Sequence, residues 1–309
     1  MARPELDSDV ARIMALKALP AFAHLEADDL AMFASRAEPR EFASGTPIFG
    51  PEEGSQEVHL VVAGRVREER SGAGSRSVEP YALVAATDVL AGRVGAGAAW
   101  AEGPVVTLAL ERELLLGLLE ENFDALLGVA REMASALMDT RRRLGPRAGY
   151  DSPADAGQPV DGDPGLVERI LHLRGGLSRV DARLSTVCRL ALETRSASHA
   201  AGAALWSAGD PADHALFLLS GRVRCVSEDA AQRFECGSGA ILGLEDSLAR
   251  QVRWYSAAAA EPVQALLAPT GLLIDLLEDD PPTAVRGLVA AAELVSELLD
   301  RRAEEESEA

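Results

Sequence analysis

The side chains that most often perform catalysis or bind metals are few in this sequence and lie far apart. The five histidines are His24, His59, His172, His199 and His214. No two of them have metal-ligand spacing with a third candidate nearby. No serine or cysteine lies in a recognisable nucleophile turn, and the only lysine, Lys17, is not part of a phosphate-binding Gly-Lys-Ser/Thr run. We therefore expect a protein that is not an enzyme, with no catalytic residues, no metal ligands and no cofactor.

The cysteines and the start of the chain indicate the compartment. The cysteines are Cys188, Cys225 and Cys236. Their odd number and irregular spacing give neither a zinc motif nor a disulfide framework, so free thiols in a reducing compartment are expected. Residues 1–5 lack the basic segment of a secretory signal, and no apolar run reaches the ~20 residues of a membrane helix. These features predict a cytoplasmic protein that makes no membrane contact.

The negative charge of the chain indicates which partners it can bind. The net charge is -19, and residues 1–144 and residues 165–309 each carry -8. Nucleic-acid affinity comes largely from lysines and arginines that neutralise phosphates. Because neither half is basic, nucleic-acid binding is not expected.

A stretch of 23 residues occurs twice, at 45–67 and at 202–224, with an offset of 157 residues and no gap. Both copies begin with a glycine and end in Gly-Arg-Val-Arg. A duplication at this period indicates two similar domains in tandem. The paired glycines, Gly45 with Gly202 and Gly64 with Gly221, stand where strands should turn, and we expect a positive φ at each.

The pattern around these copies predicts the order of the chain. We expect a first domain at 1–144, a flexible Gly/Pro/Asp-rich linker at 145–164, a second domain at 165–303 and an acidic tail at 304–309. Each domain starts with apolar-periodic helical segments, continues with short strands and closes with a helix, at 123–144 and at 283–302. The closing helices carry heptad-like apolar stripes. Each stripe packs on its own domain, or it forms a helix–helix interface within the chain or between two chains.

The duplicated stretch carries a recognisable pattern. In the second copy its residues are Gly202, Leu205, Trp206, Gly209, Asp210, Asp213, Phe217, Leu219, Gly221 and Val223. This pattern resembles the core of the cyclic-nucleotide-binding domain, as in bacterial catabolite-activator-like regulators and protein kinase A regulatory subunits. The resemblance implies a mainly β fold with flanking α-helices: two tandem eight-stranded antiparallel jelly rolls, each with N-terminal helices and a C-terminal helix.

The resemblance also implies where a ligand would bind. In this family a phosphate-binding cassette follows the repeated strands, and a Gly-Glu pair there begins a short helix. The glutamate accepts a hydrogen bond from the ribose, and a later arginine binds the cyclic phosphate. Backbone N–H groups at the helix start add to anion binding. By this pattern the candidate ligand-binding residues are Gly243, Glu245, Arg253, Trp254, Tyr255 and Ser256.

This sequence departs from the cassette pattern, so the cassettes look degenerate. Arg253 stands at the arginine position, but Leu244 occupies the glutamate position and Glu245 comes one residue later. A slip of one residue rotates a helical side chain by ~100°. Bulky aromatic residues follow Arg253 where small residues normally admit the phosphate. An alternative is that Arg253 forms an ion pair within the protein and the aromatic residues fill the pocket. The matching region of the first domain, 88–104, has neither the Gly-Glu pair nor a suitably placed arginine.

Three functions are compatible with these features. The leading hypothesis is a non-enzymatic regulatory or scaffold protein that has lost or altered nucleotide binding and interacts with a protein partner, or with itself, through helices 123–144 and 283–302. The alternative is a sensor that binds a cyclic nucleotide (cyclic AMP or cyclic GMP) or another anionic ligand in its second domain through Arg253. A catabolite-activator-type transcription regulator fits less well, because no DNA-binding domain follows the second roll and the charge has the wrong sign for DNA.

Overall fold

The computed structural model describes residues 6, 8–144, 164–228 and 232–308. Most of the expected linker, 145–163, lies outside these ranges. Among the helices in these ranges, none combines the length and apolar character that a membrane span requires.

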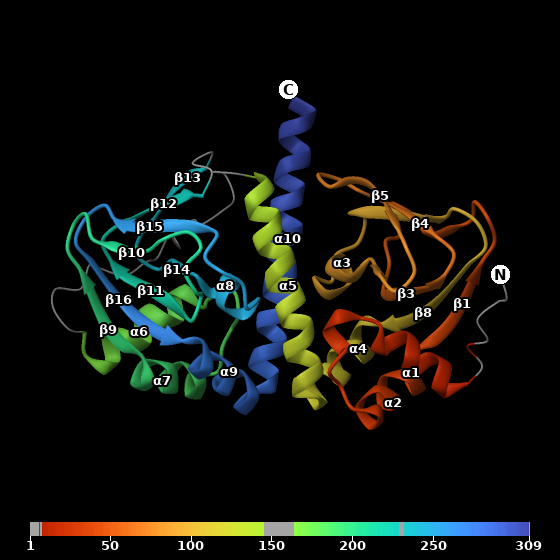
Figure 1. Ribbon diagram of the computed structural model, residues 1–309, viewed down its shortest axis with the longest axis horizontal. Coiled ribbons are helices and arrows are strands. Elements are labelled where there is room, and N and C mark those ends of the chain that lie inside the picture. Colours follow the sequence, from red (N-terminus) through yellow and green to blue (C-terminus); the bar gives the residue numbers. More distant parts are fainter. Residues whose placement is uncertain (1–5, 7, 145–163, 229–231, 309) are drawn as a thin grey trace. The chain divides into compact units, whose positions relative to one another are not determined.

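The same order of elements occurs twice along the chain (Figure 1). The helices of the first repeat are α1 (Asp9–Lys17), η1 (Pro20–Phe22), α2 (Ala27–Arg36), α3 (Ala86–Leu90), α4 (Arg112–Glu121) and α5 (Phe123–Leu144). Its strands are β1 (Glu38–Phe42), β2 (Pro47–Phe49), β3 (Glu57–Ala63), β4 (Val66–Arg70), β5 (Gly74–Val78), β6 (Leu83–Val84), β7 (Gly97–Ala101) and β8 (Val105–Glu111).

The second repeat follows the same plan. Its helices are α6 (Leu166–Gly176), α7 (Leu184–Glu193), α8 (Leu244–Leu248), α9 (Thr270–Asp279) and α10 (Pro281–Glu308). Its strands are β9 (Arg195–His199), β10 (Ala204–Trp206), β11 (His214–Ser220), β12 (Val223–Ser227), β13 (Arg233–Cys236), β14 (Ile241–Leu242), β15 (Tyr255–Ala259) and β16 (Val263–Pro269).

Each repeat folds its strands into two four-stranded antiparallel sheets with the same strand order. In the first repeat the orders are β1-β8-β3-β6 and β2-β7-β4-β5, and in the second they are β9-β16-β11-β14 and β10-β15-β12-β13. This architecture confirms the predicted pair of eight-stranded jelly rolls with flanking helices.

The duplication extends to the strand register. Glu38 pairs with Ala109 in the first repeat, and its equivalent Arg195 pairs with Leu267 in the second, so the two partners are offset by 157 and 158 residues. The predicted turn glycines Gly64 and Gly221 have φ of 85° and 82°. A Cβ at either position would lie within 2.3 Å of a backbone carbonyl oxygen, so both turns need glycine for space as well as for backbone conformation.

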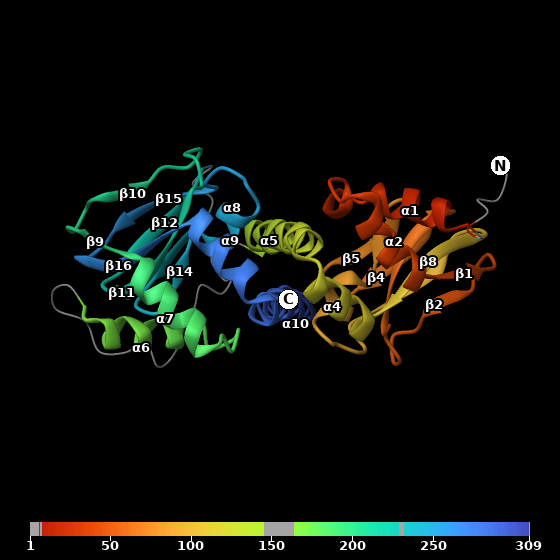
Figure 2. The same cartoon turned by 90° about the horizontal axis from the view of Figure 1, so that it is seen from below.

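Strand β11 shows how one strand supports two cores. Leu216 and Leu218 belong to the cluster inside the second roll. Their neighbours Ala215, Phe217 and Leu219 belong to a second cluster with residues of α6 and α7. Because alternate side chains of a strand point to opposite faces, one face of β11 lines the roll and the other is covered by these two helices (Figure 2).

The ends of the two repeats differ from the sequence expectation. Short helices α4 and α9 precede the closing helices and were not predicted. Helix α10 continues to Glu308, six residues beyond the predicted end at 302, so the helix includes most of the predicted acidic tail. Its sequence from Ala303 contains no glycine or proline that would stop it.

By their internal contacts, the residues divide into two compact units. The first unit consists of Met1–Met133 and Leu288–Ala309, and the second of Ala134–Gly287. This division differs from the domain boundaries expected from the sequence at both closing helices. The expected domains at 1–144 and 165–303 remain a prediction.

Candidate functional site

The candidate site of the second repeat lies between strands β14 and β15. Gly243 follows β14 with a φ of 72° and is the N-cap of α8. A Cβ at this position would lie 2.0 Å from Nη1 of Arg253. Glycine at 243 therefore both turns the chain into the helix and makes room for the guanidinium.

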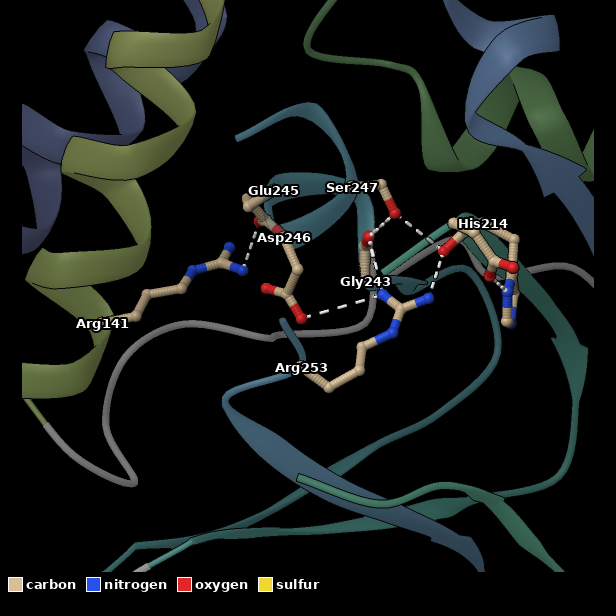
Figure 3. Close-up of polar contacts among 8 residues, drawn as sticks. Arg141, His214, Gly243, Glu245, Asp246, Ser247 and Arg253 are labelled. Carbon is tan, nitrogen blue, oxygen red and sulfur yellow. Dashed lines mark hydrogen bonds and ion pairs between the residues drawn. The ribbon is translucent and has the colours of Figure 1, made fainter. Parts of the chain in front are cut away.

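Arg253 is the largest fully buried side chain of this region. Its Nη1 donates to the carbonyl oxygen of Gly243 at 3.0 Å, and its Nη2 donates to the carbonyl oxygen of His214 at 2.5 Å (Figure 3). The guanidinium also lies 4.3 Å from the ring centroid of Trp206. Planar guanidinium groups bind carbonyls and stack on aromatic rings in this manner. Arg253, the residue expected to bind a phosphate, is thus already hydrogen-bonded to the protein's own backbone.

A buried carboxylate lies beside this arginine. Oδ2 of Asp246 is 3.7 Å from Nη1 of Arg253, and both side chains are almost completely inaccessible. Burial raises the pKa of Asp246 to about 7, and the neighbouring charge of Glu245 acts in the same direction, while Arg253 opposes it. Removal from water disfavours the ionised form of a carboxyl group. The pair therefore holds a carboxyl group that takes up a proton near neutral pH.

Glu245, the candidate ribose ligand, is bound by the end of α5. Nη1 of Arg141 donates to Oε1 of Glu245 at 2.5 Å, and only 6% of the Arg141 side chain is exposed. The next residue, Arg142, lies over the ring of Trp254 at 5.8 Å. Its carbonyl oxygen accepts a hydrogen bond from the side-chain amide of Gln232.

The aromatic residues that follow Arg253 lie inside the roll. Trp254 and Tyr255 are buried in one cluster with Trp206 and Phe234. Their ring centroids are 5.0 to 5.8 Å apart, which is the range of favourable aromatic packing. Ser256 lies on β15, where its Oγ accepts from the backbone N–H of Ala208 at 2.9 Å. These three candidate residues therefore contact the protein itself.

In the first repeat, the corresponding region borders a small depression next to α3. Arg70 lines it and forms a bidentate ion pair with Asp88, at 2.8 and 2.6 Å. Arg93 lines it as well and pairs with Asp300 of α10 at 2.5 Å. Each arginine of this depression is therefore neutralised by a carboxylate of the first unit.

The described residues contain no cluster of three or more histidine, cysteine, aspartate or glutamate side chains that could hold a metal ion. The three cysteines are free, and Cys225 and Cys236 are buried in the second roll whereas Cys188 is half-buried on α7. Burial and a hydrogen bond to Cys236 raise the pKa of the Cys225 thiol. Since the thiolate is the reactive species, burial makes this thiol inert.

We expect a thiol reagent such as DTNB to modify one cysteine of the native protein and all three in denaturant. The fast site should be Cys188, because it is the only thiol with partial exposure. Titration of the native protein and of Cys188→Ser measures this, and the variant should show no fast reaction. Rapid native reaction of all three thiols would show that the second roll opens readily.

A comparison with protein-family models finds a match in the second repeat. Residues 197–280 match the family model described as "Cyclic nucleotide-binding domain". This range includes the strands β10 to β16 and the helix α8. Among curated proteins, none matches the chain.

Several solved structures match the chain at low sequence identity. The regulatory subunit of a cAMP-independent protein kinase A from Trypanosoma brucei is 15% identical, with a TM-score of 0.35, and the match covers 90% of each chain. A cyclic nucleotide-binding domain from Methylobacillus flagellatus is 20% identical, with a TM-score of 0.38, over 46% of this chain and 84% of that one. The second repeat thus matches the cyclic-nucleotide-binding-domain family model, and the jelly-roll fold occurs in both repeats.

Proposed function

We propose that this chain is a non-enzymatic regulatory or scaffold protein of the cytoplasm, and that its second domain acts as an interaction module without binding cyclic nucleotides in the family's manner. The observation that carries this proposal is the burial of Arg253. Its guanidinium already donates to the carbonyl oxygens of Gly243 and His214.

A cyclic phosphate could bind Arg253 only at the expense of these contacts. The two carbonyl oxygens would lose the charged donor and would keep only their contacts with Ser247, and hydrogen bonds to charged groups are stronger than those to neutral ones. The arginine would also have to leave the ring of Trp206, 4.3 Å away. A phosphate would thus have to replace several contacts that already exist within the protein.

The other candidate contacts support the same proposal. Oε1 of Glu245 is already paired with Arg141, so a ribose hydroxyl would have to share this carboxylate with the arginine. The buried rings of Trp254 and Tyr255 occupy the interior of the roll. A nucleotide base would have to displace aromatic groups that pack against one another.

Partner binding through helices 123–144 and 283–302 remains part of the proposal. The stripe residues Leu126, Met133 and Leu137 of α5 are buried, as are Leu288 and Val295 of α10. A partner at these helices would therefore meet their polar sides and not the apolar stripes.

A thermal-shift titration with cyclic AMP, cyclic GMP and cyclic dinucleotides tests the proposal. We expect no change in melting temperature with any of them. A ligand at 100 times its dissociation constant would stabilise the native state by about 2.7 kcal/mol, which is easily detected. A shift that disappears in Glu245→Gln would contradict the proposal and make the protein a nucleotide sensor.

A further inference from the structure

The end of each closing helix belongs to the compact unit that contains the other repeat's strands. Residues from Ala134 onward, in the second half of α5, are part of the second unit. Residues from Leu288 onward, in α10, are part of the first unit. Each unit is thus assembled from both repeats.

In the second unit, the end of α5 makes three kinds of contact. Arg141 binds Glu245 on the short helix α8. The carbonyl oxygen of Arg142 accepts from Gln232. Met138 has no exposed surface and belongs to the cluster inside the second roll, together with Trp254. The roll is therefore completed by a side chain from the first repeat.

In the first unit, the end of α10 contacts the region around α3. Oγ of Ser296 donates to Oδ1 of Asp88 at 2.9 Å, and Asp300 pairs with Arg93 at 2.5 Å. The turn between β4 and β5 approaches the helix backbone closely, because a Cβ at Gly72 would lie 1.7 Å from the carbonyl oxygen of Leu299. Gly72 thus leaves room for α10.

The two contacts have opposite polarity. Helix α5 brings the cation Arg141 to the carboxylate of Glu245, whereas α10 brings the carboxylate of Asp300 to the cation Arg93. If each helix end lay against the short helix of its own repeat, α5 would bring its arginines towards Arg93. Likewise, α10 would bring Asp300 towards Glu245. Like charges placed together disfavour such pairing.

We propose that the two repeats are a covalently joined, heterotypic pair, in which the helix ends at 134–144 and 288–308 are docking segments for the opposite repeat. The α8 region of the second repeat accepts a basic helix end, and the α3 region of the first accepts an acidic one. The charge pattern specifies first-with-second pairing, and the covalent linker is not needed to keep the repeats together. This inference is independent of nucleotide binding.

A nicked full-length chain tests the inference. A protease site is inserted within 145–163, and the purified protein is cleaved and analysed by size-exclusion chromatography with light scattering. We expect the two fragments to co-elute with the mass of the intact chain and to separate only in denaturant. Separation of the fragments in native buffer would overturn the proposal.

Charge reversal tests whether the opposite charges of the two helix ends determine how the repeats pair. In the nicked protein, Arg141→Glu together with Asp300→Arg should weaken association of the fragments by about tenfold or more, because each helix end then meets a like charge. Adding Glu245→Arg and Arg93→Glu should restore co-elution. Arg143→Glu is the matched control, since Arg143 is exposed on the same helix end. Unchanged association after reversal of both pairs, with the fold intact by circular dichroism, would rule out charge as the basis of pairing.

Discussion

Arg253→Ala is expected to lower the free energy of unfolding by about 3 to 5 kcal/mol, the range for breaking a buried ion pair. The substitution removes the charged donor from the carbonyl oxygens of Gly243 and His214 and leaves them only Ser247. It also leaves the buried carboxyl group of Asp246 without its cation. Chemical denaturation of the variant and of the unchanged protein measures the difference.

Arg224→Ala is the matched control for this prediction. Arg224 lies on the neighbouring strand β12, pairs with Glu235 at 3.3 Å and is 61% exposed. Exposed pairs of this kind contribute about 0 to 1 kcal/mol. Equal effects of the two alanine variants would contradict the buried position of Arg253. The large expected loss also means that Arg253→Ala cannot by itself identify a ligand contact, since an unfolded domain loses every ligand.

The second large effect concerns pH and Asp246. Its pKa in the folded protein, about 7, lies above the ordinary value of 3.8. The folded state therefore holds this proton more tightly than the unfolded chain does. The stabilisation is complete below about pH 4 and is lost as the pH rises through about 7.

Asp246→Asn removes this titration. Relative to the unchanged protein, the variant should gain about 2 to 3 kcal/mol of unfolding free energy between about pH 5 and pH 8. The comparison must use the difference between the two proteins at each pH, because burial lowers the pKa of His59 to about 4 and gives a slope of opposite sign at acidic pH. A difference that stays constant across this range would show that Asp246 titrates normally.

The jelly rolls could be predicted because their determinants are local and duplicated. The turn glycines at 64 and 221, and the apolar runs of β3 and β11, are visible in both copies. The pairing of Glu38 with Ala109 recurs in the second repeat as Arg195 with Leu267, so the same strands pair in both copies. The pattern within each copy and the repetition between the copies therefore predicted the same fold.

The contacts of the candidate site could not be predicted in the same manner. The main partners of Arg253 are backbone carbonyl groups, which every residue possesses and which leave no mark in the sequence. The pairing of Arg141 with Glu245 joins residues 104 positions apart. Spacing along a helix relates only side chains three or four residues apart, so it does not reveal a pair across that distance.

The position of α10 in the first unit also affects the order of folding during synthesis. Residues 288–308 leave the ribosome after the whole of the second unit, and at about 5 to 20 residues per second the intervening 134–287 take about 8 to 30 s. Throughout that interval Asp88 and Arg93 lack their partners Ser296 and Asp300. The part of the protein that is translated first is therefore completed last, and it is the part that chaperones and proteases encounter in the nascent chain.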